Sequence, residues 1–197
     1  MDFTGFVLQE LPQAPARVIE IGCGELGGVV PALVVAGYDA IGVDPNAPDG
    51  ERFLRADFRE VDGAFDAAVA GRVIHHLFPL GEALDHLARL APQVVVDEFA
   101  WDLIGPDMEA WYDARRRELE DPKGPPSIGE WRSRHADELH AHDAVLDALR
   151  ARWDERVIEW RPYLYRWLGD DVESPDRIGY WWAGSRTETT RSSAESR

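Results

Sequence analysis

Cysteine is nearly absent from this sequence, and long apolar runs are missing. Cys23 is the single cysteine among 197 residues, so no disulfide can form within one chain and a reducing compartment is favoured. The first residues carry neither a basic stretch nor a long apolar stretch, and no apolar run approaches the roughly 20 residues of a membrane span. We therefore expect a cytoplasmic protein with no signal peptide and no membrane partner.

Positive charge is also scarce. The chain has 21 Lys and Arg against 37 Asp and Glu, a formal net charge of −16. An acidic surface repels phosphate backbones, whereas nucleic-acid binders usually present a basic stripe. The one arginine cluster, residues 115–117, is followed by acids, so we expect it to be a self-paired helix face. A nucleic-acid partner is therefore disfavoured, although a local basic patch is compatible with a negative total.

What the sequence does contain is an alternation of short apolar runs and helical patterns. Continuous apolar runs predict buried parallel strands with helices on both faces of the sheet, an α/β doubly wound fold. The predicted strands cover residues 17–21, 39–43, 53–56, 65–70, 93–97, 156–160 and 177–182, and the predicted helices begin with 27–37 and 80–90. We expect one domain over residues 1–185, followed by a disordered polar tail over 186–197.

Residues 101–153 are helical in pattern and rich in tryptophan. A helix is predicted over 108–119, and the capping-box spacing of Ser127 and Glu130 predicts the start of another that runs to about residue 153. A continuous helix would place His135 and His142 on its apolar face. A break at residues 139–143, with Asp143 capping a new helix, would instead point His140 at the cleft.

A glycine-rich segment follows the first predicted strand. Gly22, Gly24 and Gly27 allow a tight turn and let a ligand approach the strand–helix junction. This spacing alone also suits a dinucleotide. Glu20, two residues before the first glycine, disfavours a pyrophosphate and suits a ligand with ammonium and sulfonium groups.

Two further acids end the next predicted strands. Asp44 ends the second strand and can accept hydrogen bonds from two ribose hydroxyls, a feature that NAD proteins share. Asp57 ends the third strand and can accept from an adenine amino group, while Phe58 can cover the ring. Glu20 and Asp57 together argue against NAD.

Over residues 18–97 the chain resembles the class I S-adenosylmethionine (SAM)-dependent methyltransferases, in their small-molecule branch. The matching positions lie in four motifs in family order: Glu20, Gly22, Gly24 and Gly27 in the glycine motif, Asp44 at the ribose, Asp57 with Phe58 at the adenine, and Ala70 with Gly71 at the methionine end. Cys23 and Pro45 adjoin these motifs and complete the expected cofactor site. The resemblance implies a Rossmann-like, mostly parallel seven-stranded sheet with an antiparallel last strand. It also implies SAM as cofactor and S-adenosylhomocysteine as product.

The same resemblance implies methyl transfer to an oxygen or nitrogen atom of a small molecule, under a helical lid formed by residues 101–153. His75, Glu98 and His140 are the candidate bases that we favour, and His76 and His142 are alternatives. The candidate substrate contacts are Trp101, Tyr112, Trp131 and His142, and residues 154–167 are expected to form another wall of the pocket. No metal site is predicted, because His140 and His142 do not have helical ligand spacing and no cysteine supports them.

Three other interpretations stay open at this point. An RNA or protein methyltransferase would need a basic groove, which the sequence does not reveal. A SAM- or nucleotide-binding protein without methyl transfer is compatible with every motif, because no invariant catalytic residue defines this superfamily. An NAD-dependent oxidoreductase fits the glycines alone. A homodimer is a candidate assembly.

Overall fold

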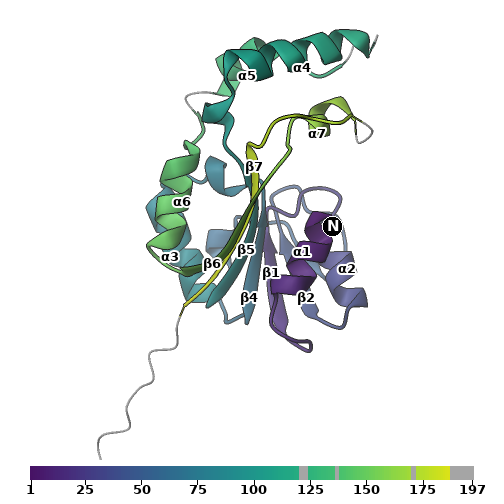
Figure 1. The fold of residues 1–197 in the computed structure, drawn as a ribbon. Coiled ribbons are helices and arrows are strands. Elements are labelled where there is room, and N and C mark those ends of the chain that lie inside the picture. Colours follow the sequence, from purple (N-terminus) through teal and green to yellow (C-terminus); the bar gives the residue numbers. More distant parts are fainter. Residues whose placement is uncertain (120–123, 136–137, 170–171, 187–197) are drawn as a thin grey trace, which may run out of the picture.

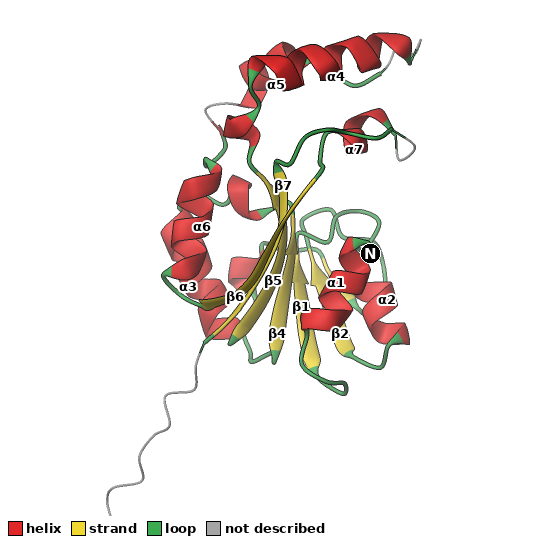
Figure 2. Cartoon of the chain, in the orientation of Figure 1, coloured by secondary structure: helices red, strands yellow, loops and turns green. Residues whose placement is uncertain are grey.

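The computed structural model describes residues 1–119, 124–135, 138–169 and 172–186. Its centre is a seven-stranded sheet in the order β3-β2-β1-β4-β5-β7-β6 (Figures 1 and 2). The strands are β1 (Arg17–Ile21), β2 (Asp39–Val43), β3 (Phe53–Leu54), β4 (Ala67–Gly71), β5 (Gln93–Phe99), β6 (Asp154–Arg161) and β7 (Gly179–Ser185). β1 to β5 pair in parallel, and β7 runs antiparallel to both β5 and β6. The predicted fold class, including the antiparallel last strand, is confirmed.

Helices cover both faces of the sheet (Figure 1). On one face lie α1 (Phe3–Glu10) and α2 (Val30–Val35); on the other lie α3 (Leu80–Leu90) and α6 (His142–Arg150). Beyond the ends of the strands lie α4 (Pro106–Glu118), α5 (Ile128–His135) and the short α7 (Tyr165–Leu168). Single 3₁₀ turns occur at η1 (Phe58–Glu60), η2 (Ile74–His76) and η3 (Trp101–Leu103).

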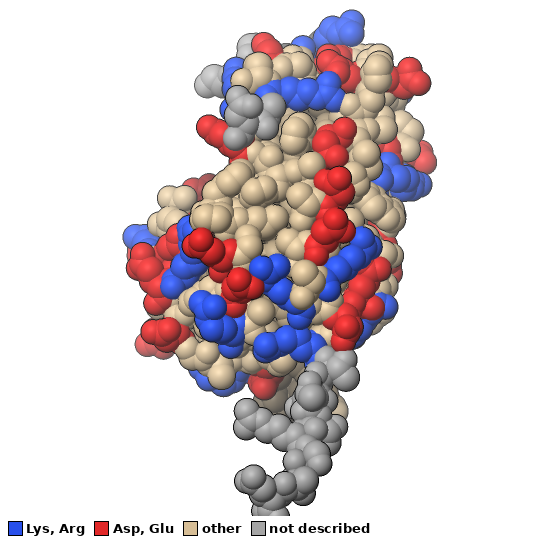
Figure 3. Space-filling model, turned by 90° about the vertical axis from the view of Figure 1, so that its left-hand side faces the viewer, with Lys and Arg blue, Asp and Glu red and all other residues tan. Residues whose placement is uncertain are grey.

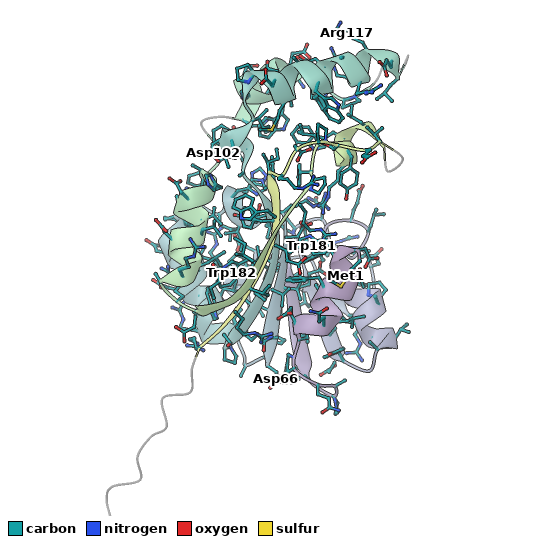
Figure 4. The ribbon with its side chains drawn as sticks, in the orientation of Figure 1. Met1, Asp66, Asp102, Arg117, Trp181 and Trp182 are labelled. Carbon is teal, nitrogen blue, oxygen red and sulfur yellow. The ribbon has the colours of Figure 1, made fainter. Side chains whose placement is uncertain are left out.

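The alternation of side chains along each strand divides the interior into two cores. In β7, the neighbouring Trp181 and Trp182 point to opposite faces of the sheet (Figure 4). Trp181 packs against α1, with its ring 5.3 Å from that of Phe6. Trp182 is fully buried in the core under α3 and α6. The sheet is therefore packed on both faces.

The carboxyl ends of four parallel strands meet at one edge. Ile21 pairs with Val43 on one side and Ala70 on the other, and Gly71 pairs with Asp97. The loops after these strands consequently start side by side, and α4, α5 and α7 lie beyond the same edge (Figure 1). Ligands bind at this edge in open α/β sheets.

The long helix predicted from Ser127 to about residue 153 is wrong, and the alternative with a break is right. α5 ends at His135 and α6 begins at His142. The predicted capping box is present, since Ser127 N donates to Glu130 Oε2 at 2.9 Å and Glu130 N donates to Ser127 Oγ at 3.2 Å. Asp143 is not the cap of α6; the N-cap is Ala141, and the carboxylate of Asp102 accepts from His142 N at 3.0 Å.

Only part of the expected lid lies over the strand ends. α4 and α5 do, whereas α6 buries Val145, Leu146 and Leu149 against the α3 face of the sheet. The lid and the single domain over 1–185 remain predictions. Of the predicted tail, Arg186 N still donates to Pro92 O at 2.8 Å, and residues 187–197 lie outside the described residues. Within the described ranges, no helix is both long and apolar enough to cross a membrane.

Candidate active site

A cavity of about 730 Å³ opens where the loop after β1 meets the end of β4, and we call it the glycine-loop cavity. Its lining comes from residues 2–4, Glu20, most of residues 22–29, and Gly71, Arg72, Asp97, Tyr165 and Arg166. Five residues predicted to bind the cofactor, namely Glu20, Gly22, Cys23, Gly24 and Gly71, therefore line one space.

The shape of this cavity depends on glycines in left-handed conformations. Gly22 has φ +71°, and a Cβ there would lie 2.7 Å from Val73 Cβ. Gly28 has φ +55°, and a Cβ there would lie 2.1 Å from Glu20 Oε1. Gly24 also has a positive φ, +64°, but a Cβ there would meet nothing within 4 Å. Gly22 and Gly28 are required by the fold, while Gly24 leaves open space that a ligand can fill.

Glu20 is buried at the floor of the cavity and caps α2. Its Oε2 accepts from Val29 N at 2.8 Å and from Val30 N at 3.2 Å. Burial raises the pKa of this carboxyl to about 7. The predicted contact with a cationic ligand stays a prediction, and the capping role was not foreseen.

Asp44 joins the glycine-loop cavity to a second space. One carboxylate oxygen accepts from Gly24 N at 3.1 Å, and the other accepts from Asn46 N at 2.7 Å. Gly24 lines the glycine-loop cavity, whereas Asn46 and Pro45 line a neighbouring hollow of about 370 Å³, which we call the Pro45 hollow. Glu25 lines both spaces. A ligand longer than the first cavity could thus extend past Asp44.

Asp57 and Phe58 lie apart from both of these spaces. The guanidinium of Arg59 binds the carboxylate of Asp57, with Nη2 2.6 Å from Oδ2, and holds its pKa below the usual value. Phe58 is buried in the core, with its ring 5.9 Å from that of His86. Neither side chain lines the glycine-loop cavity or the Pro45 hollow. Arg59 occupies part of the Asp57 carboxylate, and the contacts of Asp57 and Phe58 with adenine stay predictions.

A third cavity of about 310 Å³, which we call the aromatic cavity, lies on the other side of Gly71 and Arg72. These two residues line both the aromatic and the glycine-loop cavity. The other lining residues are aromatic or histidine: Phe99, Trp131, Tyr163, Trp167, His75, His76 and His135. The two cavities are therefore neighbours, separated by a two-residue wall at the end of β4.

His75 and Glu98 form a buried pair beside this wall. His75 Nδ1 is hydrogen-bonded to Glu98 Oε2, and Glu98 Oε1 accepts from Ile74 N at 2.7 Å and from His75 N at 3.3 Å. Glu98 is fully buried and does not itself line the cavity. Because a carboxylate only accepts hydrogen bonds, we assign a proton to Nδ1, so the lone pair of the neutral His75 ring is on Nε2.

Two more histidines and a stacked aromatic pair complete the aromatic cavity. The rings of His75 and His76 are 4.1 Å apart, and burial, together with the neighbouring His75, lowers the pKa of His76. His135 stacks on Trp131 and bonds through Nδ1 to Trp131 O at 2.8 Å. Phe99 and Tyr163 lie parallel, with ring centroids 4.1 Å apart.

Buried acids hold the wall segment of residues 162–168 in place. Asp176 accepts from Tyr163 N at 2.8 Å and from Leu164 N at 3.1 Å. Asp97 binds Arg166 at 2.7 and 3.3 Å, so α7 is tied to the end of β5. The segment presents Tyr163 and Trp167 to the aromatic cavity and Tyr165 and Arg166 to the glycine-loop cavity. Of the wall predicted over residues 154–167, only this last part lines either of the two cavities, since residues 154–161 form β6; the acids that hold the segment were not predicted.

Among the four predicted substrate contacts, only Trp131 lines the aromatic cavity. Tyr112 is fully buried and donates to Pro126 O at 3.1 Å, so it belongs to the core between α4 and α5. Trp101 Nε1 donates to His140 O at 2.9 Å. The ring of His142 bonds through Nδ1 to Asp102 at 2.7 Å.

His140, one of the three favoured candidate bases, also lies outside the aromatic cavity. Its Nε2 bonds to Leu77 O at 3.0 Å, and its ring stacks on Phe78 at 4.0 Å. The break between α5 and α6 thus occurs as considered, but it does not point His140 at the cavity. Of the other two, His75 lines the cavity and Glu98 lies behind it.

One group of side chains within the described ranges has metal-ligand geometry. Asp102, His142 and Asp143 offer ligand atoms within 4.8 Å of one another. The group is at the partly exposed start of α6, away from the aromatic cavity, and the His142–Asp102 hydrogen bond accounts for it. It gives no reason to add a metal to the site.

Comparison with known proteins shows the family of this chain. Residues 2–156, more than half of the chain, match the family model described as a methyltransferase domain. The chain belongs to the SAM-dependent methyltransferase family. The methyltransferase has no match among curated proteins.

Solved structures agree with this assignment at the level of fold. The methyltransferase superimposes on geranyl diphosphate C-methyltransferase from Streptomyces coelicolor with TM-score 0.62 and 13% identity, covering 93% of this chain and 78% of that one. Magnesium protoporphyrin IX methyltransferase from Synechocystis superimposes with TM-score 0.58 and 15% identity, covering 93% of this chain and 80% of that one. A possible histamine N-methyltransferase from Thermotoga maritima superimposes with TM-score 0.58 and 15% identity, covering 94% of this chain and 87% of that one. The acceptors named for these three proteins differ widely.

Proposed function

We propose that this methyltransferase transfers a methyl group from SAM, bound in the glycine-loop cavity, to the hydroxyl oxygen of a planar aromatic small molecule bound in the aromatic cavity. The observation that carries the proposal is the shared wall. Gly71 and Arg72 line both cavities, and His75, a base with a free lone pair, lies on the acceptor side of that wall.

The glycine-loop cavity has the features that SAM requires. SAM supplies a methyl group on a positively charged sulfur. The open space at Gly24 and the backbone at Gly71 would hold the methionine end, with Glu20 near its ammonium group. Asp44, between the cavity and the Pro45 hollow, would accept from the ribose hydroxyls, so that the adenosine extends past Pro45.

His75 is the proposed general base. Its Nε2 would take the proton of the acceptor hydroxyl, while Glu98 stabilises the positive imidazolium that forms. Two backbone N–H groups hold Glu98 from the other side, so the base has a fixed orientation. A neutral aromatic amine is the second candidate acceptor, because the same base can take its proton.

The cavity walls support a planar acceptor. Phe99, Trp131, Tyr163 and Trp167 supply apolar faces, and the volume of about 310 Å³ lies at the small end of ligand pockets. A macromolecular acceptor finds less support: among the described side chains on the face drawn in Figure 3, basic and acidic groups are interspersed and form no continuous basic groove. The His75–Glu98 pair in turn favours catalysis over binding alone.

The test compares His75→Gln with the matched control His76→Gln. His76 lies 4.1 Å away in the same cavity, but the described structure gives it no carboxylate partner. With SAM and a panel of phenols, formation of S-adenosylhomocysteine is measured for each variant. We expect kcat to fall about 100- to 10,000-fold for His75→Gln, the range for loss of a general base, with SAM affinity unchanged. Equal kcat values for His75→Gln and the wild type would contradict the proposal.

A further inference from the structure

Arg72 has an unusual backbone conformation. Its φ of +57° makes it the single non-glycine residue with a positive φ among the described residues. Arginine rarely adopts this conformation, and such strain persists only where the surroundings impose it. Here Arg72 N donates to Asp97 O at 2.6 Å, directly after β4. The result is an arginine side chain at the wall that the two cavities share.

The guanidinium of Arg72 has no strong partner of its own. Its nearest carboxylate oxygen, Asp97 Oδ2, lies 3.9 Å from Nε. That carboxylate already binds Arg166 at 2.7 Å and accepts from Trp181 Nε1 at 3.0 Å. Within the described residues, no side chain or backbone group accepts a hydrogen bond from Arg72 Nη1 or Nη2, and its side chain is 53% exposed. Arg72 is therefore free to bind an anion from outside the chain.

The two cavities differ in charge. Four carboxylates line the glycine-loop cavity, from Asp2, Glu20, Glu25 and Asp97, against the two guanidinium groups of Arg72 and Arg166. None of the described residues that line the aromatic cavity is acidic, and Arg72 is its one Lys or Arg. SAM carries two positive charges and one negative charge, so its net charge of about +1 complements the acidic cavity. The complementary ligand for the aromatic cavity is an anion.

We infer that Arg72 binds a carboxylate of the acceptor, and that the acceptor is an aromatic hydroxy acid. This inference rests on the proposed function, since it names the substrate class of the same site. A guanidinium pairs with a carboxylate through two parallel hydrogen bonds. Such a pair would hold the aromatic ring inside the cavity that Phe99 and Trp131 line, with the hydroxyl left for His75.

The test measures binding, so that it does not depend on turnover. Calorimetric titration with 4-hydroxybenzoate and 4-hydroxybenzamide, in the presence of S-adenosylhomocysteine, compares the wild type with Arg72→Gln. Arg72→Lys keeps the charge, Arg72→Asn tolerates the left-handed backbone, and Arg117→Gln removes an exposed charge on α4 as a control. We expect the wild type and Arg117→Gln to bind the acid at least tenfold more tightly than the amide. Arg72→Gln and Arg72→Asn should lose this preference, and Arg72→Lys should keep most of it.

Three outcomes would overturn the inference: equal binding of acid and amide by the wild type, a preference that survives in Arg72→Gln, or an Arg72→Gln effect confined to the affinity for S-adenosylhomocysteine. The last would assign Arg72 to the donor's carboxylate instead. A different result would contradict the proposed function and leave this inference intact. If the acid binds through Arg72 and SAM is bound, yet no phenol is methylated, the anion site stands and the transfer to oxygen does not.

Discussion

The two cavities that meet at Gly71 and Arg72 are built in different ways. The glycine-loop cavity takes half of its lining residues from one short stretch, residues 20–29, and its shape comes from the backbone conformations of Gly22, Gly24 and Gly28. The aromatic cavity is made of side chains from four separate segments: residues 71–76, Phe99, α5 and residues 162–168. A contiguous backbone motif can be recognised in a sequence, and it constrains one ligand. Side chains brought together by the fold can change one at a time, so the acceptor side can vary while the donor side stays fixed.

The substitution with the largest expected effect is Glu98→Ala, which should affect the aromatic cavity on the acceptor side and not the glycine-loop cavity on the donor side. The change leaves His75 Nδ1 and two buried N–H groups without their acceptor. We expect the free energy of unfolding to fall by about 3–5 kcal/mol, as for other broken buried pairs. Chemical denaturation measures this loss, and Glu98→Gln is the matched control because it keeps an acceptor oxygen. If SAM affinity fell while stability held, Glu98 would belong to the donor side.

Glu20 predicts a pH dependence on the donor side. Its folded pKa of about 7 lies above the ordinary value of 4.5, so the folded state without ligand holds the proton more tightly than the unfolded state. The contribution to stability is fully present below pH 4.5 and is lost as pH rises through 7, with an upper limit of about 3 kcal/mol. Denaturation between pH 4.5 and 8 should show this loss in the wild type and a smaller loss in Glu20→Gln. Identical slopes for the two proteins would show that Glu20 does not titrate there.

Asp44→Ala probes the join between the glycine-loop cavity and the Pro45 hollow. We expect SAM binding to weaken by about 1–3 kcal/mol, because the ribose hydroxyls lose their acceptor. The free energy of unfolding should change less than the free energy of SAM binding, since the Asp44 carboxylate is only half-buried. Calorimetric titration with SAM measures the effect, and Asp57→Ala tests the adenine contact in parallel. Unchanged affinity in a folded Asp44→Ala protein would rule out the donor pose.

The sequence signals for the sheet and for the glycine loop are local. The apolar runs indicate the strands, and the spacing of the glycines with Asp44 predicts the cofactor edge, whereas no local pattern gives the strand order. The capping box at Ser127 is equally local, and it is present as predicted. α1 and α7 were not predicted; α7 has only four residues, too few to show a helical period.

The acceptor side was harder to predict because its geometry depends on contacts between distant residues. His142 bonds to Asp102, 40 positions away, and His140 bonds to Leu77, 63 positions away, so neither ring lines the aromatic cavity. Tyr112 follows Trp111 on α4, and it is buried by Ile128 and Trp167 of other segments. The importance of Arg72 comes from its backbone conformation and its place between two cavities, which no spacing pattern reveals.

The most direct test of the shared wall is a crystal structure of the methyltransferase with S-adenosylhomocysteine and 4-hydroxybenzoate. The account predicts S-adenosylhomocysteine in the glycine-loop cavity, with its sulfur at Gly71 and facing the aromatic cavity. It also predicts the acceptor hydroxyl within hydrogen-bonding distance of His75 Nε2, about 2.6–3.2 Å. A sulfur that faces away from the aromatic cavity, or an acceptor that binds elsewhere, would contradict it.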